Sequence, residues 1–213
     1  MVAEVVSINV GTPRTVEWRG QVVTSAVWKQ PVDGDVRIEG VNLVGDDQAD
    51  RRVHGGTDKA IYAYSVEDYA WWAAITGPLA PATFGENLTT AGIELNECHI
   101  GDRWHVGSAV LEVAQPRRPC FKLGIRMDDD GFPRIFTLAR RPGAYLRVIS
   151  EGTITACDVI DIEPAQQPAI AIGDLVSGDV PVEVLRLAIE DSRVPTGWRQ
   201  RAERALARAD DGG

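Results

Sequence analysis

Short apolar segments separated by glycine turns constrain the fold of this chain more than any other feature. The segments "VAEVVSI", "GQVVTSAVWK" and "AYLRVIS" are rich in valine, isoleucine and threonine, and glycine recurs between such runs, as at Gly34, Gly45 and Gly92. β-Branched residues pack well on a pleated surface and therefore favour strands. Many short strands with frequent glycine predict a mostly β domain, either a barrel or a sandwich, over residues 1–165.

The segment "DRWHVGSAVLEVAQP" predicts two strands joined by a turn at Gly107-Ser108. In its second half, Val110 and Glu112 are expected on one face and Leu111 with Val113 on the other, because successive side chains of a strand point to opposite sides. The run "GTITACDVIDIEP" is predicted to complete the β region.

One helix is predicted to interrupt the strands. Ser65 can cap its N-terminus, and "VEDYAWWAAIT" follows until Gly77-Pro78 stops it. Its residues Tyr69, Trp72 and Ala73 are expected to pack inward, as part of the core.

Proline-rich "EPAQQPA" predicts a linker, after which residues 171–213 favour a small helical region. Asp179 is the expected N-cap of a first helix, with Pro181 near its first turn. A second helix is predicted over "PTGWRQRAERALARA", where Trp198 and Leu206 lie on one face at helical spacing.

Charge and composition exclude several classes of protein. A net charge of −9 argues against nucleic-acid binding, which needs an extended basic face. No apolar run approaches the roughly 20 residues of a membrane span, and the first residues do not resemble a signal peptide. Cys98, Cys120 and Cys157 are odd in number and widely spaced, which argues against a disulfide framework and favours a reducing compartment, the cytoplasm.

The most basic segment, "QPRRPCFKL", contains a thiol. Arg117, Arg118 and Lys122 surround Cys120 in sequence, and a thiol reacts as its thiolate, which cations favour. Pro119 biases Arg118 toward an extended conformation and would hold the sulfur in one direction. A buried, inert cysteine is the alternative interpretation. Cys98 and Cys157 lack such surroundings and are interpreted as structural.

Two further segments could bind a ligand. In "VHGGTDKA", the backbone N–H groups of Gly55 and Gly56 could form an anion-binding nest, with Lys59 adding charge and His54 a donor. A hairpin turn is the alternative. In "FGENLTTAG", Gly85 permits an unusual backbone angle and Asn87 could contact a heterocycle, whereas an ordinary turn is again the alternative.

Other site classes lack their motifs. The chain has no C-x-x-C pair and no H-x-x-x-H, so a structural zinc site is not expected. It also has no Walker phosphate loop, no G-x-S-x-G nucleophile elbow and no dinucleotide fingerprint.

Taken together, "GDDQADRRVHGGTDKA", "FGENLTTAGI", "IGDRWHVGSAVLEVAQPRRPCFKL" and the tail "LRLAIEDSRVPTGWRQRAERAL" resemble the MOSC domain family. This family is named after the C-terminal domain of molybdenum cofactor sulfurases, and the resemblance is to its stand-alone YiiM-like form. It covers about residues 2–209 in the family's order. It implies a MOSC-type β-barrel with a few short helices over residues 1–165 and a small three-helix appendage in the tail.

The resemblance also implies a cofactor site. Family members bind the molybdenum cofactor, and the cysteine that corresponds to Cys120 is the protein's ligand to the metal. A tungsten analogue is not distinguished from molybdenum. By the same resemblance, the cofactor's phosphate or pterin would be held by cationic and amide groups at Arg117, Arg118, Lys59, Gly55, Gly56, Asn87, Lys122, Arg140 and Arg141.

Reactions attributed to the family reduce N-hydroxylated compounds, such as hydroxylaminopurines and amidoximes, from N–OH to N–H. His54 is the expected proton donor. The chain has no flavin or nicotinamide motif, and three cysteines cannot hold a four-cysteine iron–sulfur cluster, so electrons are expected from a separate flavin or iron–sulfur reductase. The tail could serve as a homodimer contact or as a docking surface for that reductase.

Two other functions fit the same residues. The chain could be a cofactor carrier or sulfur-relay protein with a persulfide on Cys120, or a non-catalytic β-barrel binding module.

Two departures from the family pattern stand out. Cys157 occupies a position where glycine is expected, and the acidic loop "RMDDDGFPRIF" shows few helix signals and is expected to border the substrate entrance.

Overall fold

The structure is a computed structural model that describes residues 2–47 and 56–211, without the side chains of the last two residues of that range. The strands are β1 (Glu4–Val10), β2 (Arg14–Trp18), β3 (Gln21–Ser25), β4 (Gln30–Val32), β5 (Val36–Glu39), β6 (Asn42–Leu43), β7 (Ile61–Ser65), β8 (Leu88–Ala91), β9 (Arg103–Val106), β10 (Ala109–Pro116), β11 (Ala144–Ser150), β12 (Gly152–Ile154) and β13 (Ile160–Glu163). The helices are α1 (Val66–Thr76), α2 (Phe121–Met127), α3 (Phe132–Ala139), α4 (Ile172–Leu175), α5 (Val182–Glu190) and α6 (Thr196–Asp211), with short 3₁₀ turns η1 (Thr57–Lys59) and η2 (Leu95–Glu97).

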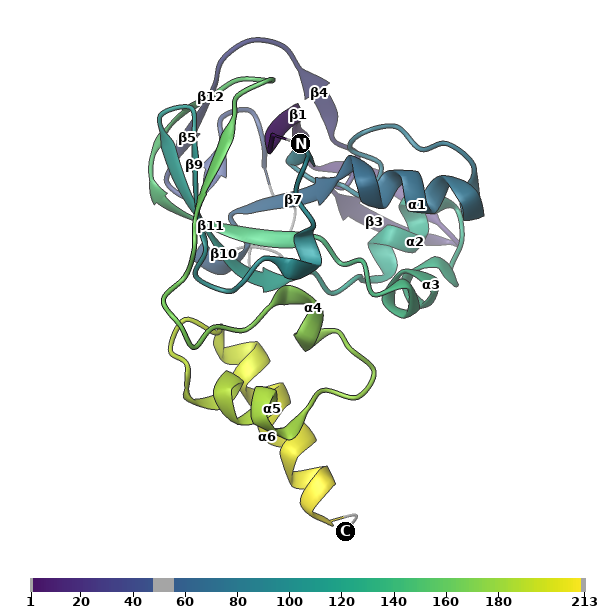
Figure 1. The fold of residues 1–213 in the computed structure, drawn as a ribbon. Coiled ribbons are helices and arrows are strands. Elements are labelled where there is room, and N and C mark those ends of the chain that lie inside the picture. Colours follow the sequence, from purple (N-terminus) through teal and green to yellow (C-terminus); the bar gives the residue numbers. More distant parts are fainter. Residues whose placement is uncertain (1, 48–55, 212–213) are drawn as a thin grey trace.

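The core is an eight-stranded sheet in the order β13-β9-β10-β11-β7-β8-β1-β4. All of its ladders are antiparallel except β7–β8, which is parallel. Helices α1, α2 and α3 lie at one side of the sheet, and α4–α6 lie beyond one of its ends (Figure 1). The predicted sheet-rich fold with several helices is confirmed.

A closed barrel is not found among the described residues. The two outer strands of the sheet, β13 and β4, are not joined by a ladder. The first residues of β1 reach the segment before β13 through an isolated bridge, Glu4–Val159, and a hydrogen bond from Val5 N to Asp158 O. Two more backbone hydrogen bonds, from Cys157 N to Val5 O and from Ile160 N to Ala3 O, belong to the same contact, and Thr155 N donates to an Asp158 carboxylate oxygen in the turn between β12 and β13.

The hairpin of β9 and β10 has the predicted turn at Gly107-Ser108, and its alternation is as expected, with Leu111 and Val113 buried. Between Val113 and Gln115 the register with β11 shifts. Consequently residues 113–117 are buried in succession rather than alternately. The shift matters because the segment that carries Arg117, Arg118 and Cys120 begins directly after β10.

Helix α1 has the predicted bounds. The Ser65 hydroxyl accepts a hydrogen bond from Asp68 N at 3.1 Å, and Gly77 ends the helix. Tyr69 and Trp72 are buried, as predicted. They belong to a group of eight buried residues that we call the aromatic cluster: Tyr62, Tyr64, Tyr69, Trp72, Phe84, Leu123, Phe132 and Phe136.

The acidic loop after residue 126 was interpreted as poor in helix signals, and that interpretation is wrong, because α3 forms there. The Asp129 carboxylate accepts a hydrogen bond from Gly131 N at 2.7 Å and organises the preceding turn. Pro133 lies in the first turn, where its missing N–H costs nothing. Phe132 and Phe136, four residues apart, insert into the aromatic cluster.

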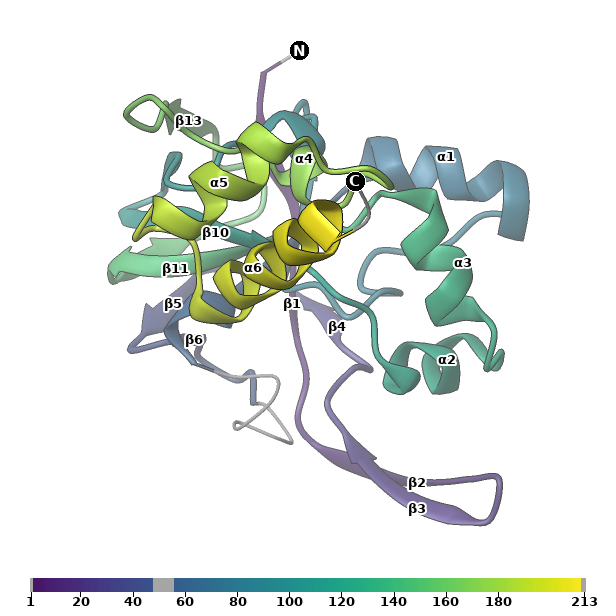
Figure 2. The same cartoon turned by 90° about the horizontal axis from the view of Figure 1, so that it is seen from below.

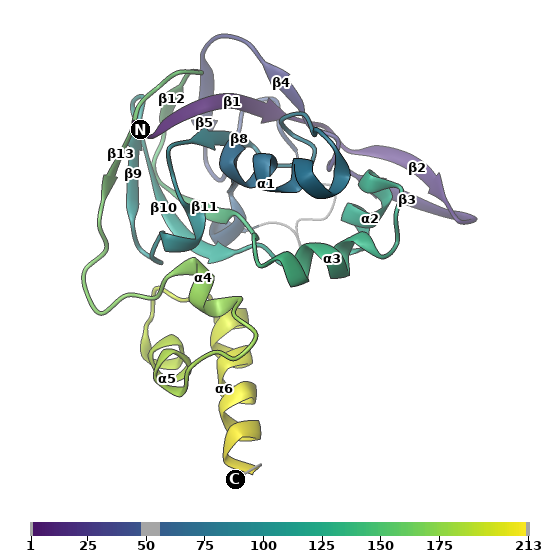
Figure 3. The same cartoon turned by 45° about the vertical axis from the view of Figure 1, so that its right-hand side comes forward.

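The two predicted C-terminal helices are present as α5 and α6, but the predicted cap is wrong. Pro181, not Asp179, stands at the N-cap position of α5, and no side chain caps that helix. Buried residues of these helices, including Leu185, Ala188 and Trp198, belong to the same hydrophobic cluster as the sheet. The tail is thus packed on the sheet (Figure 3), and its division from residues 1–165 as a separate unit stays a prediction.

Strands β2 and β3 form a two-stranded arm that extends away from the sheet (Figure 2). The predicted strand over 20–29 ends at Ser25, whose hydroxyl accepts a hydrogen bond from Val27 N. At the other end of the arm, Trp18 Nε1 donates to Asp130 at 3.1 Å. Within the described residues, no helix combines the length and the apolar character needed to cross a membrane.

Candidate active site around Cys120

Cys120 lies between the end of β10 and the start of α2. Its side chain is half-buried, and it lines a cavity of about 100 Å³. We call this the thiol cavity; its lining includes Cys120, Lys29, Asp46, Lys59 and Lys122. Cys120 is therefore not a fully buried cysteine, because it borders open space and charged groups, while its reactivity stays a prediction.

The two arginines before Cys120 have different environments. Arg117 is buried, donates to Phe84 O and holds its guanidinium carbon 4.7 Å from the centre of the Tyr62 ring. Arg118 is exposed and faces a second cavity, of about 290 Å³, which also contains Cys120. Alternation along an extended backbone, favoured at Arg118 by Pro119, explains why consecutive arginines separate in this way.

Two lysines accompany the thiol. Lys59 and Lys122 both line the thiol cavity, and Lys59 lines the second cavity as well. Burial and, next, the nearby Arg118 charge lower the pKa of Lys59, while attraction to Asp58 and to the Cys120 sulfur opposes this change. The Lys59 ammonium and the Cys120 sulfur are therefore electrostatic neighbours.

A buried ion pair that the sequence patterns did not suggest forms the back of the thiol cavity. The ammonium of Lys29 contacts Asp46, and the two side chains are 8% and 1% exposed. The same carboxylate accepts from Gly11 N at 2.8 Å. Burial lowers the pKa of Lys29, and the Asp46 charge only partly offsets this effect. Lys29 is thus a cation that releases a proton more readily than an ordinary lysine does.

Asn87 lines the thiol cavity, but its polar atoms bond within the protein. Its carbonyl oxygen accepts from Tyr62 N at 3.2 Å, and its amide donates to Asp46 at 2.9 Å and to Asn9 O at 3.3 Å. Asn87 therefore fixes the cavity wall and orients Asp46, while its predicted contact with a ligand stays a prediction.

Gly85, in the same wall, has a φ of +76°, which confirms the unusual backbone angle expected there. A Cβ at this position would also lie 2.9 Å from a methyl group of Val27 and 3.1 Å from its carbonyl oxygen. Only glycine satisfies both the angle and the close approach of these two chain segments.

Tyr62 and Tyr145 complete the wall near Cys120. Burial raises the pKa of both phenols, so they are neutral at physiological pH. The Tyr62 hydroxyl donates to Pro142 O at 2.7 Å, and its ring lies 5.0 Å from that of Tyr145. These rings supply a rigid wall that keeps water from one side of the thiol.

Glu86 is a fully buried carboxyl group behind this wall. One oxygen accepts from Tyr69 at 2.7 Å, Ala82 N at 2.7 Å and Thr89 at 3.0 Å, while the other has no hydrogen-bond partner among the described residues. Burial raises the pKa of this carboxyl group. A protonated Glu86 avoids the cost of an unpaired buried charge.

The predicted glycine nest is only partly described. Gly56 is exposed with a φ of +97°, and its carbonyl accepts from Lys59 N at 3.0 Å. Gly56 thus begins the turn that carries Lys59 toward the thiol. His54 and Gly55 lie outside the described residues, so their predicted roles stay predictions.

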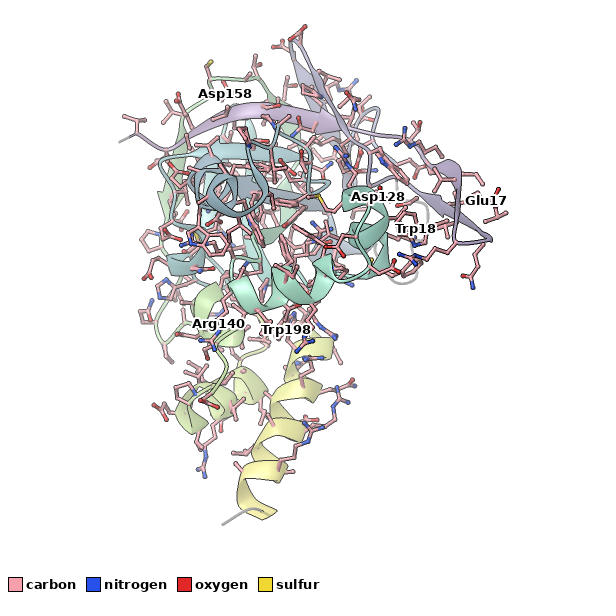
Figure 4. All side chains as sticks on the ribbon, turned by 90° about the vertical axis from the view of Figure 1, so that its right-hand side faces the viewer. Glu17, Trp18, Asp128, Arg140, Asp158 and Trp198 are labelled. Carbon is pink, nitrogen blue, oxygen red and sulfur yellow. The ribbon has the colours of Figure 1, made fainter. Side chains whose placement is uncertain are left out.

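Arg140 and Arg141 lie away from Cys120, around a third cavity of about 440 Å³. Arg141 pairs with Asp68, and its guanidinium carbon lies 5.0 Å from the centre of the Trp71 ring. Arg140 is exposed and adopts a left-handed backbone with φ of +53°. Figure 4 labels Arg140 and Trp198 where α3 and the following loop meet α6.

Three adjoining cavities therefore surround the site. Lys59, Cys120 and Tyr145 are shared by the thiol cavity and the second cavity, which we call the middle cavity. Arg118 and Trp198 are shared by the middle cavity and the third, which we call the arginine cavity. Cys120 thus opens toward the tail helices as well as toward Lys29.

The other cysteines take no part in this site. Cys98 is buried, and burial raises the pKa of its thiol to about 12. Cys157 is exposed with a φ of +73°, the conformation that the expected glycine would favour. In the described part of the chain, no group of three or more histidine, cysteine or acidic residues could hold a metal ion by itself.

Comparison with known proteins decides the family. The MOSC domain family model matches residues 50–161, which include the Lys59 turn, the FGENL segment and Cys120. The chain belongs to the MOSC domain family. This MOSC chain is 38% identical to YflK of Bacillus subtilis over 152 residues, 71% of the chain and 69% of that relative.

Two further likenesses bear on fold and function. The crystal structure of YiiM from Geobacillus stearothermophilus matches with a TM-score of 0.77 at 27% identity, over 96% of this chain and 99% of that one. A protein named "Reductase" from Gibberella moniliformis is 35% identical over 151 residues, 67% of this chain but only 26% of the relative. The resemblance to the YiiM-like members of the MOSC family is thereby confirmed.

Proposed function

We propose that this MOSC protein binds the molybdenum cofactor through Cys120 and reduces N-hydroxylated compounds, with electrons from a separate flavin or iron–sulfur reductase. Membership of the MOSC family and the likeness to a protein named "Reductase" support the proposal. The observation that carries it is the environment of Cys120, a half-buried thiol that borders a cavity together with Lys59 and Lys122.

The residues present fit such a cofactor. A cysteine sulfur is a soft ligand, suited to a metal already held by sulfur. Lys59, Lys122 and Arg118 would neutralise the phosphate of the cofactor, since phosphate and basic side chains form strong charge-assisted hydrogen bonds. When bound, the cofactor would supply the two-electron chemistry, which no protein side chain at this site can provide.

The chain itself would supply protons. Conversion of N–OH to N–H with release of water consumes two electrons and two protons. His54 is the predicted donor. Burial lowers the pKa of two described cations of the thiol cavity, Lys29 and Lys59, and of these Lys29 is the more deeply buried, whereas Lys59 is assigned to the phosphate. We therefore infer that Lys29 Nζ delivers a proton, while Asp46 holds the ammonium in place.

The first experiment measures molybdenum and tungsten in protein made in a cofactor-competent host, for the wild type and Cys120→Ser. We expect near-stoichiometric metal in the wild type and a large loss in the variant. Negligible metal in both proteins would contradict the proposal. A persulfide found on Cys120 in that case would favour the alternative, a cofactor carrier or sulfur-relay protein.

The proton role of Lys29 is tested with Lys29→Arg, which keeps the charge beside Asp46 but does not release a proton near neutral pH. We expect kcat to fall about 100-fold, the lower end of general acid catalysis, with little change in metal content. The wild-type kcat should fall as pH rises through the lowered Lys29 pKa. An unchanged kcat in the variant would exclude Lys29 as the donor.

Three further parts of the proposal concern the surroundings of the protein: its location in the cytoplasm, a homodimer formed through the tail helices, and a separate reductase as electron donor. Sedimentation analysis of the purified chain tests the dimer. Activity with and without an added flavin or iron–sulfur reductase tests the electron donor.

A further inference from the structure

The arginine cavity is the largest of the three cavities and is unusually basic for an acidic protein. Its volume is about 440 Å³, which lies in the range of small-molecule sites. Seven arginines line it, and no aspartate or glutamate is among the described residues that do so. They come from two parts of the chain: Arg117, Arg118, Arg140 and Arg141 from the segments around α2 and α3, and Arg201, Arg204 and Arg208 from α6.

Most of this charge is not compensated within the protein. Arg117 donates to a backbone carbonyl and Arg141 pairs with Asp68. By contrast, no described acidic side chain forms an ion pair with Arg118, Arg140, Arg201, Arg204 or Arg208.

These arginines repel one another. Burial lowers the pKa of Arg201, and the charges of Arg118, Arg204 and Arg208 lower it further. Repulsion between these arginines across the cavity destabilises the protein, and a bound anion would offset that repulsion.

The cavity also has an apolar side. Leu175, Val180 and Leu185 line it, beside the Trp198 ring that α6 contributes. The Trp198 Nε1 donates to Gln115 at 2.9 Å, which fixes the ring against β10. Arginines around a hollow with apolar walls suit an organic anion better than a flat acidic protein surface.

The position of the cavity relates it to the thiol. Arg118 and Arg201 line both the arginine cavity and the middle cavity, and Cys120 lines the middle cavity. An elongated ligand with its anionic end among the arginines could therefore place its other end toward Cys120.

We propose that the arginine cavity binds the phosphate of a nucleotide, and that the substrate presented to Cys120 is an N-hydroxylated nucleotide rather than a free base. Arginine favours phosphate because its planar guanidinium donates two parallel hydrogen bonds to it. The second half of this proposal rests on the proposed N-hydroxyl reduction, whereas the first half does not.

Calorimetric titration of the full-length protein, without added cofactor, tests the binding half. AMP and inorganic phosphate should bind, and adenosine should not. In Arg201→Ala/Arg204→Ala the Kd for AMP should rise at least about ten-fold, as expected for loss of hydrogen bonds to a charged group. Arg186→Ala is the matched control, because Arg186 is an exposed arginine of α5 that does not line the cavity; it should leave the Kd unchanged. Equal, weak binding of AMP and adenosine would overturn the proposal.

Metal content and kinetics of the same variants identify the source of the phosphate. If the double variant keeps its molybdenum but its KM rises at least about ten-fold for N-hydroxy-AMP and not for N-hydroxyadenine, the substrate half is supported. A loss of molybdenum without AMP binding would assign the cavity to the cofactor's own phosphate and overturn the proposal. Slower coupling to the reductase with unchanged AMP affinity would assign it to an acidic partner and also overturn it. Failure of the proposed N-hydroxyl reduction can be told apart from failure of nucleotide binding, because AMP binding requires neither metal nor turnover.

Discussion

The two sides of the Cys120 segment treat charge in opposite ways. Toward the aromatic cluster, each buried ionisable group that we describe has at least one hydrogen-bond partner: Lys29 with Asp46, Arg117 with Phe84 O and Glu86 with Tyr69. Toward the tail helices, five arginines of one cavity have no described acidic partner. Partners within the protein hold the charges of the first side in place, whereas the lack of acidic partners on the other side indicates a surface that binds an anion from outside the chain.

The largest effect is expected in the aromatic cluster, where a large side chain is fully buried. Trp72 is fully buried in the aromatic cluster and donates to the Tyr64 hydroxyl at 2.7 Å. Trp72→Ala should lower the free energy of unfolding by about 4 kcal/mol, measured by urea denaturation. Trp71→Ala is the control, because Trp71 is 37% exposed, and should cost less than about 1 kcal/mol. Similar losses of unfolding free energy in both variants would show that the aromatic cluster stabilises the fold no more than the surface does.

The buried pair behind the thiol comes next. Lys29→Met leaves the Asp46 carboxylate buried without its cation and should cost about 3 kcal/mol of unfolding free energy. In Lys29→Met/Asp46→Asn the unpaired charge is gone, so the double variant should lose less than the sum of the two single variants. Strictly additive losses in denaturation experiments would show that the pair is not coupled.

Glu86 tests whether a buried carboxyl group on the side of the aromatic cluster is protonated in the folded protein. Its folded pKa is raised above the ordinary value of 4.5, so the folded state binds more protons than the unfolded state as pH rises above 4.5. Stability should therefore fall between pH 4.5 and the raised pKa, and Glu86→Gln should abolish that fall. Below pH 4.5 the variant should differ from the wild type by about 1 kcal/mol or less, because glutamine resembles the protonated side chain, and above that pH the variant should be the more stable of the two. A pH dependence that survives the substitution would contradict a role of Glu86.

The smallest effect is expected on the unpaired side, and with the opposite sign. Arg201→Ala/Arg204→Ala should raise the free energy of unfolding by about 0.5 kcal/mol at low salt, because it removes repulsion between exposed like charges. The gain should vanish at high salt. A loss of stability that is independent of salt would mean that these side chains hold the tail helices in place.

Structure that depends on neighbouring residues could be predicted from the sequence. Structure that depends on contacts between distant parts of the chain could not. Ser65 and Gly77 marked the bounds of α1 because capping depends on neighbouring residues. The basic surroundings of Cys120 were visible for the same reason. Helix α3 was missed because its stability comes from Phe132 and Phe136 packing against residues from elsewhere in the chain.

The ion pair behind the thiol illustrates the limit most clearly. Lys29 ends a valine-rich run and Asp46 lies in a loop, and neither position carries a local signal of burial. The pair exists because β1, Asn87 and the segment before β4 meet there in the folded chain. The lysine at the end of this run becomes informative only when its partner is known.

The adjacent arginines at 117 and 118 show that an identical residue type need not carry an identical meaning. Arg117 lies beneath the Tyr62 ring, whereas Arg118 faces open space. A variant at Arg117 would thus be expected to lower protein abundance first, because its guanidinium is buried and bonded within the fold. A variant at Arg118 would appear as normal abundance with altered ligand preference. Two adjacent arginines are thus expected to fail in two different ways when they are replaced, one in the amount of protein and the other in what the protein binds.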